Sequence, residues 1–294
     1  MPASLEILSY AKINWTLEVL FKRHDGFHEL RTVYQTVSLN DTLSITPTSS
    51  KLEFVCDDPR VPSDETNLAF RAAVLLRETS GTSKGARVGI EKRIPVAAGL
   101  GGGSSNAAAA LLALAKLWEI EIGEAELNRI AAQLGSDVPF FLTGGTAVGV
   151  GRGEIVHPID QIECEHLLLV NPGFAVSTRD AYEKLSRLTR PEAASNIPFT
   201  LLAAKGISGL PLVARNDLEE VVLAAHPEVA EVKQRLLSLG ARHALMSGSG
   251  ATVFGVFDNS EMIERAESSV RANGYWAQRV RTVDALEYQA TIFQ

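Results

Sequence analysis

The sequence predicts an α+β protein built in two halves, and three observations support this fold class. The chain has 294 residues, and at roughly 150 residues per domain this length is typical of about two domains. Hydrophobic residues make up 46% and charged residues 21%, which is ordinary globular usage and excludes disordered and collagen-like proteins. Helix-like and strand-like segments alternate irregularly, without the regular strand–helix order of a doubly wound sheet.

The first third of the chain is predicted to be rich in strands, with one helix inserted. Apolar and polar residues nearly alternate from Ile7 to Phe21, as in a half-buried strand, and an exposed turn is expected at residues 22–26. Apolar residues at helical spacing predict a helix over residues 67–78. Further strands are expected at residues 33–39, 42–46, 51–55 and 86–92.

The rest of the chain mixes helices and short strands around one candidate domain boundary. Helices are predicted at residues 105–118 and 124–134, where Gly135 is a suitable helix end, and a strand at residues 146–150. The charged segment 154–165 is the best boundary, so we expect domains at residues 1–160 and 161–294. Beyond it, strands are expected at residues 167–170, 251–257 and 276–283, and helices at 177–188, 216–239 and 262–273.

The net charge and the cysteine content limit which partners and which compartment are expected for this protein. A net charge of −7 without any run of Lys and Arg is unfavourable for binding duplex nucleic acid. Cys56 and Cys164 provide neither a disulfide framework nor the spacing of a metal site. Residues 94–115 carry no charge, but Pro95 and four glycines indicate a loop before a buried helix instead of a membrane span. We therefore expect a cytoplasmic protein without a signal peptide, a membrane partner or a nucleic-acid partner.

A glycine-rich segment is the strongest chemical signal. Four of the 23 glycines lie within residues 99–103, in the run Ile94-Pro-Val-Ala-Ala-Gly-Leu-Gly-Gly-Gly-Ser-Ser-Asn106. Glycines let the backbone approach a ligand, and the helix start that follows attracts anions, so the segment predicts a phosphate cradle. It has neither the lysine of a Walker A loop nor the last glycine of the dinucleotide fingerprint. A flexible turn before a core helix remains the alternative.

A second glycine-rich turn, Met246-Ser-Gly-Ser-Gly-Ala251, leads into the strand expected at residues 251–257. Taken alone, this turn is equally well explained as a tight hairpin connection. Together with the first loop, it predicts the other wall of a phosphate site.

Three motifs in this order resemble the GHMP kinases. They are Ser9-Tyr-Ala-Lys12-Ile-Asn14-Trp-Thr-Leu17, the segment Pro95–Ser105, and the Gly-Ser-Gly turn after Met246. The resemblance spans essentially the whole chain. It implies a strand-rich N-terminal domain with the ATP phosphate loop (1–160) and a C-terminal α/β sandwich with an antiparallel sheet (161–294). It also implies an active site in the cleft between them, where ATP with Mg²⁺ phosphorylates an alcohol.

Further segments resemble the branch of this family that acts on a cytidine diphosphate-linked polyol in non-mevalonate isoprenoid-precursor synthesis. They are residues 22–30, Gly135-Ser-Asp137-Val-Pro-Phe-Phe, and Asn171-Pro-Gly173 with the residues that follow it. The implied reaction transfers the γ-phosphoryl group to the 2-hydroxyl of that substrate. One departure is Phe27, which stands where the family usually has Tyr, so a phenol hydrogen bond is lost while the ring face remains. A monomer or a homodimer is expected.

The resemblance implies that Asp137 accepts the proton of the attacking hydroxyl and that Lys12 stabilises the charge that develops. Without the resemblance, a helix cap for Asp137 and an exposed strand position for Lys12 are the favoured interpretations. Phosphoryl transfer has a loose transition state, so Asp137 acts either as a true base or as a carboxylate that orients the hydroxyl.

Binding residues also follow from the resemblance. ATP binding is implied for Asn67 and Lys92 near the adenine and for the loop residues Pro95, Val96, Ala97, Ala98, Gly99, Leu100, Gly101, Gly102, Gly103, Ser104 and Ser105. Substrate binding is implied for Asn14, Phe27, His28, Thr178 and Tyr182. His28 is expected to read the cytosine edge, and Phe27 and Tyr182 to sandwich the ring. No cluster of protein metal ligands is visible, so Mg²⁺ is expected to bind through the ATP phosphates.

Two other functions remain open. One is a GHMP kinase for mevalonate, homoserine or a sugar, although an aromatic pair with His28 has no purpose when the substrate lacks a base. The other is a catalytically silent nucleotide-binding protein, which would not need to retain both Lys12 and Asp137.

Overall fold

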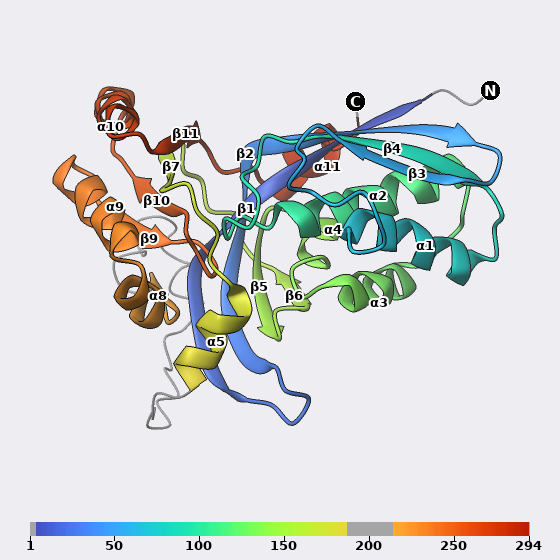
Figure 1. The fold of residues 1–294 in the computed structure, drawn as a ribbon, viewed down its shortest axis with the longest axis horizontal. Coiled ribbons are helices and arrows are strands. Elements are labelled where there is room, and N and C mark those ends of the chain that lie inside the picture. The colour runs from blue at the N-terminus through green and yellow to red at the C-terminus, as the bar shows by residue number, and fades with distance from the viewer. Residues whose placement is uncertain (1–3, 187–213, 294) are drawn as a thin grey trace.

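The computed structural model describes residues 4–186 and 214–293, and within them the strands form two sheets. The larger sheet has the order β3-β4-β2-β1-β8, with β5 paired to β2 and β6 paired to β5, and the smaller one has the order β11-β7-β10-β9. Figure 1 shows the larger sheet with α1, α2 and α3 on the right and the smaller sheet with α9 and α10 on the left. The predicted α+β class with an antiparallel C-terminal sheet is confirmed.

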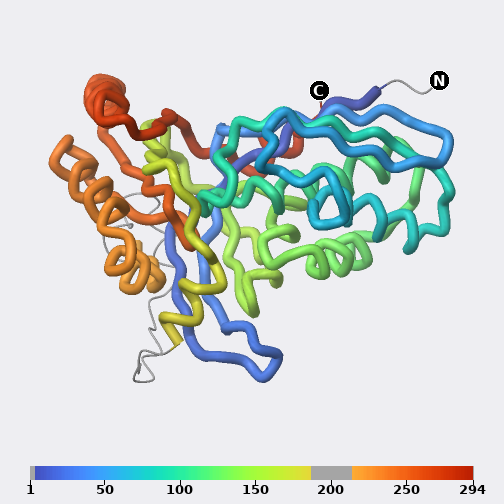
Figure 2. The backbone as a smooth tube through the Cα atoms, in the orientation of Figure 1, coloured from blue at the N-terminus to red at the C-terminus, as the bar shows by residue number. Residues whose placement is uncertain are grey.

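The larger sheet is organised around two long antiparallel strands, β1 (Leu5–Lys22) and β2 (His28–Thr48). The sequence predicted two separate strands where β2 runs unbroken, because the polar pair Asn40-Asp41 is accommodated at a register shift after Tyr10. The other strands are β3 (Leu52–Cys56), β4 (Gly85–Glu91), β5 (Thr146–Gly151), β6 (Ile155–Pro158) and the short β8 (Arg215–Asn216). The turn between β1 and β2 projects from the body at the lower edge of Figure 2.

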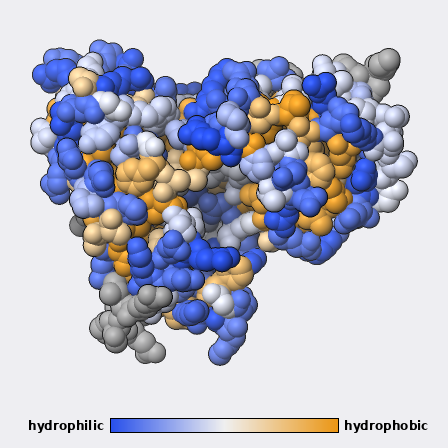
Figure 3. All heavy atoms as spheres, in the orientation of Figure 1, coloured by the Kyte–Doolittle hydropathy of each residue, from blue (hydrophilic) through white to orange (hydrophobic). Residues whose placement is uncertain are grey.

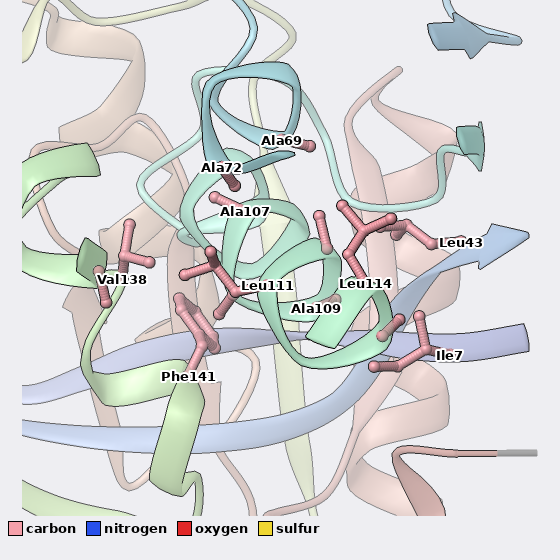
Figure 4. Close-up of a cluster of buried hydrophobic side chains, with 14 of the residues drawn as sticks. Ile7, Leu43, Ala69, Ala72, Ala107, Ala109, Leu111, Leu114, Val138 and Phe141 are labelled. Atoms are coloured by element: carbon pink, nitrogen blue, oxygen red, sulfur yellow. The ribbon is translucent and has the colours of Figure 1, made fainter. Parts of the chain in front are cut away.

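Helices α1 (Leu68–Ser80), α2 (Gly102–Trp118) and the short α4 (Phe140–Thr143) lie beside the larger sheet, and α3 (Glu124–Leu134) packs on α1 and α2. Figure 4 shows Ala69 and Ala72 of α1 facing Ala107 of α2, with Leu111 packed toward Phe141. Alanine favours the helix and its small side chain lets two helices approach closely, so the uncharged segment becomes a buried helix. No helix in the described part of the chain is long and apolar enough to cross a membrane.

The smaller sheet contains β7 (Leu167–Asn171), β9 (His243–Met246), β10 (Val253–Val256) and β11 (Trp276–Val280). Its helices are α5 (Thr178–Ser186), α8 (Glu219–Ala225), α9 (Pro227–Ser238) and α10 (Ser260–Ala272). The single helix expected over residues 216–239 is wrong: a strand comes first, and two helices meet at Pro227, whose missing N–H suits a helix start. The last two residues of the helix expected at 177–188 lie outside the described residues.

A final helix, α11 (Ala285–Thr291), was not expected from the sequence, which predicted a strand as far as residue 283. It brings the end of the chain back to the first half, where the Tyr288 hydroxyl donates to the carbonyl oxygen of Phe141. Phe293 also forms a bridge with Ile7 of β1. Along the chain, β6 of the larger sheet ends at residue 158, and β7 of the smaller sheet begins at residue 167. A domain boundary at residue 160 stays a prediction.

Candidate active site

One cleft of about 950 Å³ brings together nearly all the residues singled out from the sequence. Figure 3 shows the molecule hollowed at its centre, where Figure 1 places the segment before α2 and the start of α5. Eighteen predicted residues line it: Lys12, Asn14, Phe27, His28, Asn67, Lys92, Pro95, Val96, Ala97, Ala98, Gly99, Gly101, Gly102, Gly103, Ser104, Asp137, Thr178 and Tyr182. Leu100 and Ser105 do not line it, because both side chains are buried behind the loop.

The glycine-rich loop is shaped by positions that only glycine fits. Gly99 and Gly101 have positive φ angles of 79° and 72°. A Cβ atom on Gly99 would overlap the carbonyl oxygen of Ser247, and one on Gly101 would lie 2.8 Å from Cζ of Phe141. Gly101 is the N-cap residue of α2 and makes no side-chain cap, so the first backbone N–H groups of the helix are available to an anion.

The two glycine-rich loops touch each other. The Ser247 hydroxyl donates to the carbonyl oxygen of Gly99 over 3.0 Å, and the Thr252 N–H donates to that of Ala98 over 3.3 Å. The second loop joins the antiparallel neighbours β9 and β10, so it is a hairpin connection, and its Gly248 and Ser249 also line the cleft. The hairpin interpretation is confirmed, and the role of this turn as a wall of a phosphate site stays a prediction.

A buried carboxylate that the sequence did not single out anchors the start of the first loop. Asp41 accepts hydrogen bonds from the backbone N–H groups of Arg93 (2.7 Å) and Ile94 (2.8 Å). It also accepts one from the Asn106 amide (2.9 Å) and pairs with the Lys92 ammonium. Its signal in the sequence is weak: Asp41 is the one charged residue between Arg31 and Lys51.

Lys12 and Asp137 meet in the cleft. The Lys12 ammonium lies 3.3 Å from Oδ2 of Asp137 and donates to the Asn14 amide oxygen over 2.7 Å. The Lys12 side chain is only 4% exposed, so the exposed strand position is excluded, and Asp137 is 31% exposed toward the cleft. Asp137 is also not a helix cap, because the N-cap of α4 is Pro139.

Tyr34, on β2, is a third member of this cluster that sequence reasoning missed. Its hydroxyl donates to Oδ1 of Asp137 over 2.9 Å. Burial, and next the negative charge of Asp137, raise the pKa of Tyr34 well above its usual value, so the phenol stays protonated. Nothing in the sequence marks this tyrosine apart from the strand that carries it.

His28, Tyr182 and Phe27 form an aromatic group that also lines the cleft. The rings of His28 and Tyr182 stack with centroids 5.3 Å apart, whereas Phe27 is half exposed and has the Arg152 guanidinium 4.7 Å from its centroid. In this structure Tyr182 packs on His28, and the expected sandwich of a ring between Phe27 and Tyr182 stays a prediction. Burial, and next the charge of Lys22, lower the pKa of His28, and its buried Nε2 has no hydrogen-bond partner among the described residues.

The remaining predicted residues have defined partners in the protein. Asn67 is the N-cap of α1, where its side-chain oxygen accepts the N–H of Ala69 over 2.8 Å and its amide donates to the Pro62 carbonyl over 2.7 Å. Thr178 shares a hydrogen bond of 2.8 Å with the hydroxyl of Ser249, which joins α5 to the second glycine-rich loop. Among the described residues, no three His, Cys, Asp or Glu side chains gather in a way that could hold a metal ion.

Comparison with known families agrees with this geometry. Residues 67–145 match the GHMP kinases N terminal domain, and residues 203–275 match the GHMP kinases C terminal domain. The chain belongs to the GHMP kinase family. The fold is that of this class of phosphotransferase, as the predicted resemblance implied.

Among the family's members, the chain is similar to proteins with one particular name. The relative from Syntrophus aciditrophicus (strain SB) is 45% identical over 282 residues, covering 95% of this chain and 100% of the relative. That from Gloeobacter violaceus (strain ATCC 29082 / PCC 7421) is 42% identical, covering 86% and 85%. Both are called 4-diphosphocytidyl-2-C-methyl-D-erythritol kinase.

Two solved structures are similar to this chain to different degrees. A crystal structure of 4-(cytidine 5'-diphospho)-2C-methyl-D-erythritol kinase superposes with a TM-score of 0.79 at 39% identity, covering 95% of this chain and 99% of that chain. Homoserine kinase from Cytophaga hutchinsonii superposes with a TM-score of 0.75 at 18% identity, covering 97% and 96%, and so shares the fold alone.

Proposed function

We propose that the protein is an ATP-dependent kinase that phosphorylates the 2-hydroxyl of 4-diphosphocytidyl-2-C-methyl-D-erythritol, giving the 2-phosphate and ADP. The observation that carries the proposal is the Lys12–Asp137 pair, which lines the same cleft as the glycine-rich loop and the aromatic group. The names of relatives at 45% and 42% identity support the same substrate.

The glycine-rich loop is the proposed binding site for the ATP phosphates. A Cβ atom on Gly103 would meet only Leu68, at 3.9 Å, so the protein itself leaves open the space above this residue. The free N–H groups at the start of α2 point a positive partial charge into the same cleft. Asn67 and Lys92 are proposed to lie near the adenine, since both line the cleft beside this loop.

Mg²⁺ is proposed to arrive with ATP, because the described residues include no cluster of protein ligands and the phosphates supply the oxygen atoms this ion prefers. When bound, it would neutralise charge on the phosphates. The protein's own contribution is then to place the acceptor hydroxyl and to stabilise its oxygen.

In the proposed reaction, Asp137 accepts a hydrogen bond from the substrate hydroxyl and takes its proton as the oxygen bonds to the γ-phosphorus. The bond between that phosphorus and the bridging oxygen breaks, and its electrons leave with ADP. Lys12 stabilises the negative charge on the acceptor oxygen. Because the transition state is loose, proton transfer comes late, and orienting the hydroxyl is the main task of Asp137.

The cytidine part of the substrate is proposed to bind beside the aromatic group of the cleft. Nε2 of His28, which has no hydrogen-bond partner in the described part of the chain, is suited to hydrogen-bond the cytosine edge. Phe27 and Tyr182 offer ring faces for stacking, and Asn14 and Thr178 offer polar groups along the way to the Lys12–Asp137 pair. A cytoplasmic location and a monomeric or homodimeric state stay predictions.

An ADP-release assay tests this proposal with ATP, Mg²⁺ and four acceptors in parallel: 4-diphosphocytidyl-2-C-methyl-D-erythritol, mevalonate, homoserine and galactose. We expect turnover with the cytidyl substrate alone, and a loss of at least roughly 100-fold in kcat for Asp137→Asn, with ATP affinity retained. Turnover with another acceptor would contradict the proposed substrate and keep the kinase class. ATP binding without any turnover would favour a catalytically silent protein.

A further inference from the structure

We propose that Tyr34 is a positioning residue, whose hydroxyl holds Oδ1 of Asp137 so that the carboxylate presents one fixed face to the acceptor hydroxyl. This inference rests on the proposed function. It concerns a residue that neither the sequence motifs nor the glycine-rich loops mark.

The Asp137 carboxylate is held from two adjacent strands. Lys12 of β1 lies 3.3 Å from Oδ2, and Tyr34 of β2 donates to Oδ1 over 2.9 Å. The two strands are paired in register, with Asn14 opposite Tyr34, so both contacts are fixed to the same part of the sheet. An aspartate has two rotatable side-chain bonds, and two contacts on different oxygens define both the place and the tilt of its carboxylate.

Tyr34 itself has little freedom to move. It is 1% exposed, and its ring stacks on Phe140 with centroids 4.8 Å apart. Two glycines provide the space that it occupies: a Cβ atom on Gly149 would lie 2.5 Å from its ring, and one on Gly153 would overlap its hydroxyl. The tyrosine is therefore packed as rigidly as a core residue while its hydroxyl reaches the cleft.

Burial and the negative charges around the Tyr34 hydroxyl keep it protonated, although the positive charge of Lys12 is also near. Lys12 faces this cluster from β1, with its ammonium 5.8 Å from the Tyr34 ring centroid, and Tyr182 faces it from α5. Glu154, from the turn between β5 and β6, adds negative charge. Burial and the negative charges of Asp137 and Glu154 raise the pKa of Tyr34. Its hydroxyl therefore donates to Asp137 throughout the pH range in which a kinase is assayed.

Without the phenol oxygen, Lys12 would be the one described side chain that holds Asp137. The carboxylate could then rotate about its contact with the ammonium, and its second oxygen would lose a charge-assisted hydrogen bond. Since displacement of a reacting group by about 1 Å can cost roughly 100-fold in rate, the loss should fall on turnover and not on binding.

The test compares Tyr34→Phe with Tyr10→Phe. Tyr10 is a matched control, because it is also buried in the larger sheet, its hydroxyl bonds Thr291 over 2.7 Å, and it does not line the cleft. Steady-state kcat and both KM values are measured for each variant between pH 5 and pH 9. Rates are divided by the concentration of ATP sites, counted by equilibrium dialysis with labelled ATP, so that any unfolded fraction cancels.

We expect Tyr34→Phe to lower kcat roughly 10- to 100-fold, with both KM values within about twofold of the parent. A purely structural role would instead leave kcat per ATP site unchanged. Tyr10→Phe should keep kcat and both KM values. If the parent turns over and Tyr34→Phe matches it per ATP site, the role of Tyr34 is overturned while the proposed function stands. If the parent itself is inactive, both fail.

Discussion

The carboxylate of Asp41 contacts the ammonium of Lys92 beneath the glycine-rich loop, and the two side chains are 0% and 6% exposed. This pair is embedded in a network, since Asn106 bonds both partners and Ser9 as well. The network ties the end of β4 to the body of α2, and the loop spans the distance between them. The geometry of the phosphate cradle is therefore fixed at both ends by buried polar groups as well as by its glycines.

Replacing Asp41 with Asn should destabilise the protein by about 3–5 kcal/mol, because it leaves the Lys92 ammonium buried without a counter-charge. Urea unfolding followed by circular dichroism measures this loss. Glu91→Gln is the control, since the pair of Glu91 with Arg93 is more than half exposed and should contribute less than about 1 kcal/mol. The double variant with Lys92→Met should recover part of the loss, and equal effects of Asp41→Asn and Glu91→Gln would contradict the network.

Alanine at two glycines of the loop should change the stability of the fold in opposite directions. Gly103→Ala should leave folding intact or stabilise it by up to about 1 kcal/mol, because the residue is helical and its Cβ would meet only Leu68. The same methyl group should weaken ATP binding, since it would occupy the space proposed for the phosphates. Calorimetry of ATP binding and thermal unfolding of the same samples separate the two effects.

Gly99→Ala is the contrasting variant. Its positive φ disfavours alanine, and the new Cβ would overlap the carbonyl oxygen of Ser247 and separate the two loops. We expect stability and ATP affinity to fall together. If Gly103→Ala bound ATP as the parent does, the phosphates would have to lie elsewhere in the cleft.

Phe27 should function through its ring face. Phe27→Tyr, which restores the usual phenol, should change the KM of the cytidyl substrate by less than about threefold. Phe27→Ala should raise it roughly 10- to 100-fold, since stacking of a base on an aromatic side chain contributes about 1–3 kcal/mol. Mevalonate or homoserine turnover that survived Phe27→Ala unchanged would instead point to a substrate without a base.

The parts of the site that the sequence could predict are local. The glycine cluster, Lys12 and Asp137 stand in short motifs, and each of these segments reaches the cleft. Tyr34 and Asp41 could not be recognised in this way, because their roles depend on partners 103 and 51 residues away and on the pairing of β1 with β2. The same limit applies to α11, whose packing against Phe141 depends on contacts 147 residues apart. Local pattern does not encode such contacts.

The lowered pKa of His28 predicts how substrate binding depends on pH. Burial favours the neutral ring, and we expect its Nε2 to accept a hydrogen bond from the cytosine amine at neutral pH. As the pH falls through the lowered pKa, the ring gains a proton, and both nitrogens become donors. The KM of the cytidyl substrate should then rise at acid pH, while the KM of ATP should not follow it.

The lowered pKa of His28 also makes the stability of the fold depend on pH. The unfolded chain binds a proton at His28 more readily than the folded one, so the contribution is present above the ordinary His value and is lost as the pH falls through the folded value. His243 is a matched control, because burial also lowers its pKa and it does not line the cleft. His28→Gln and His243→Gln should both reduce the acid sensitivity of unfolding, but only His28→Gln should flatten the pH dependence of the cytidyl KM. Equal KM profiles for the parent and His28→Gln would show that His28 does not contact the base.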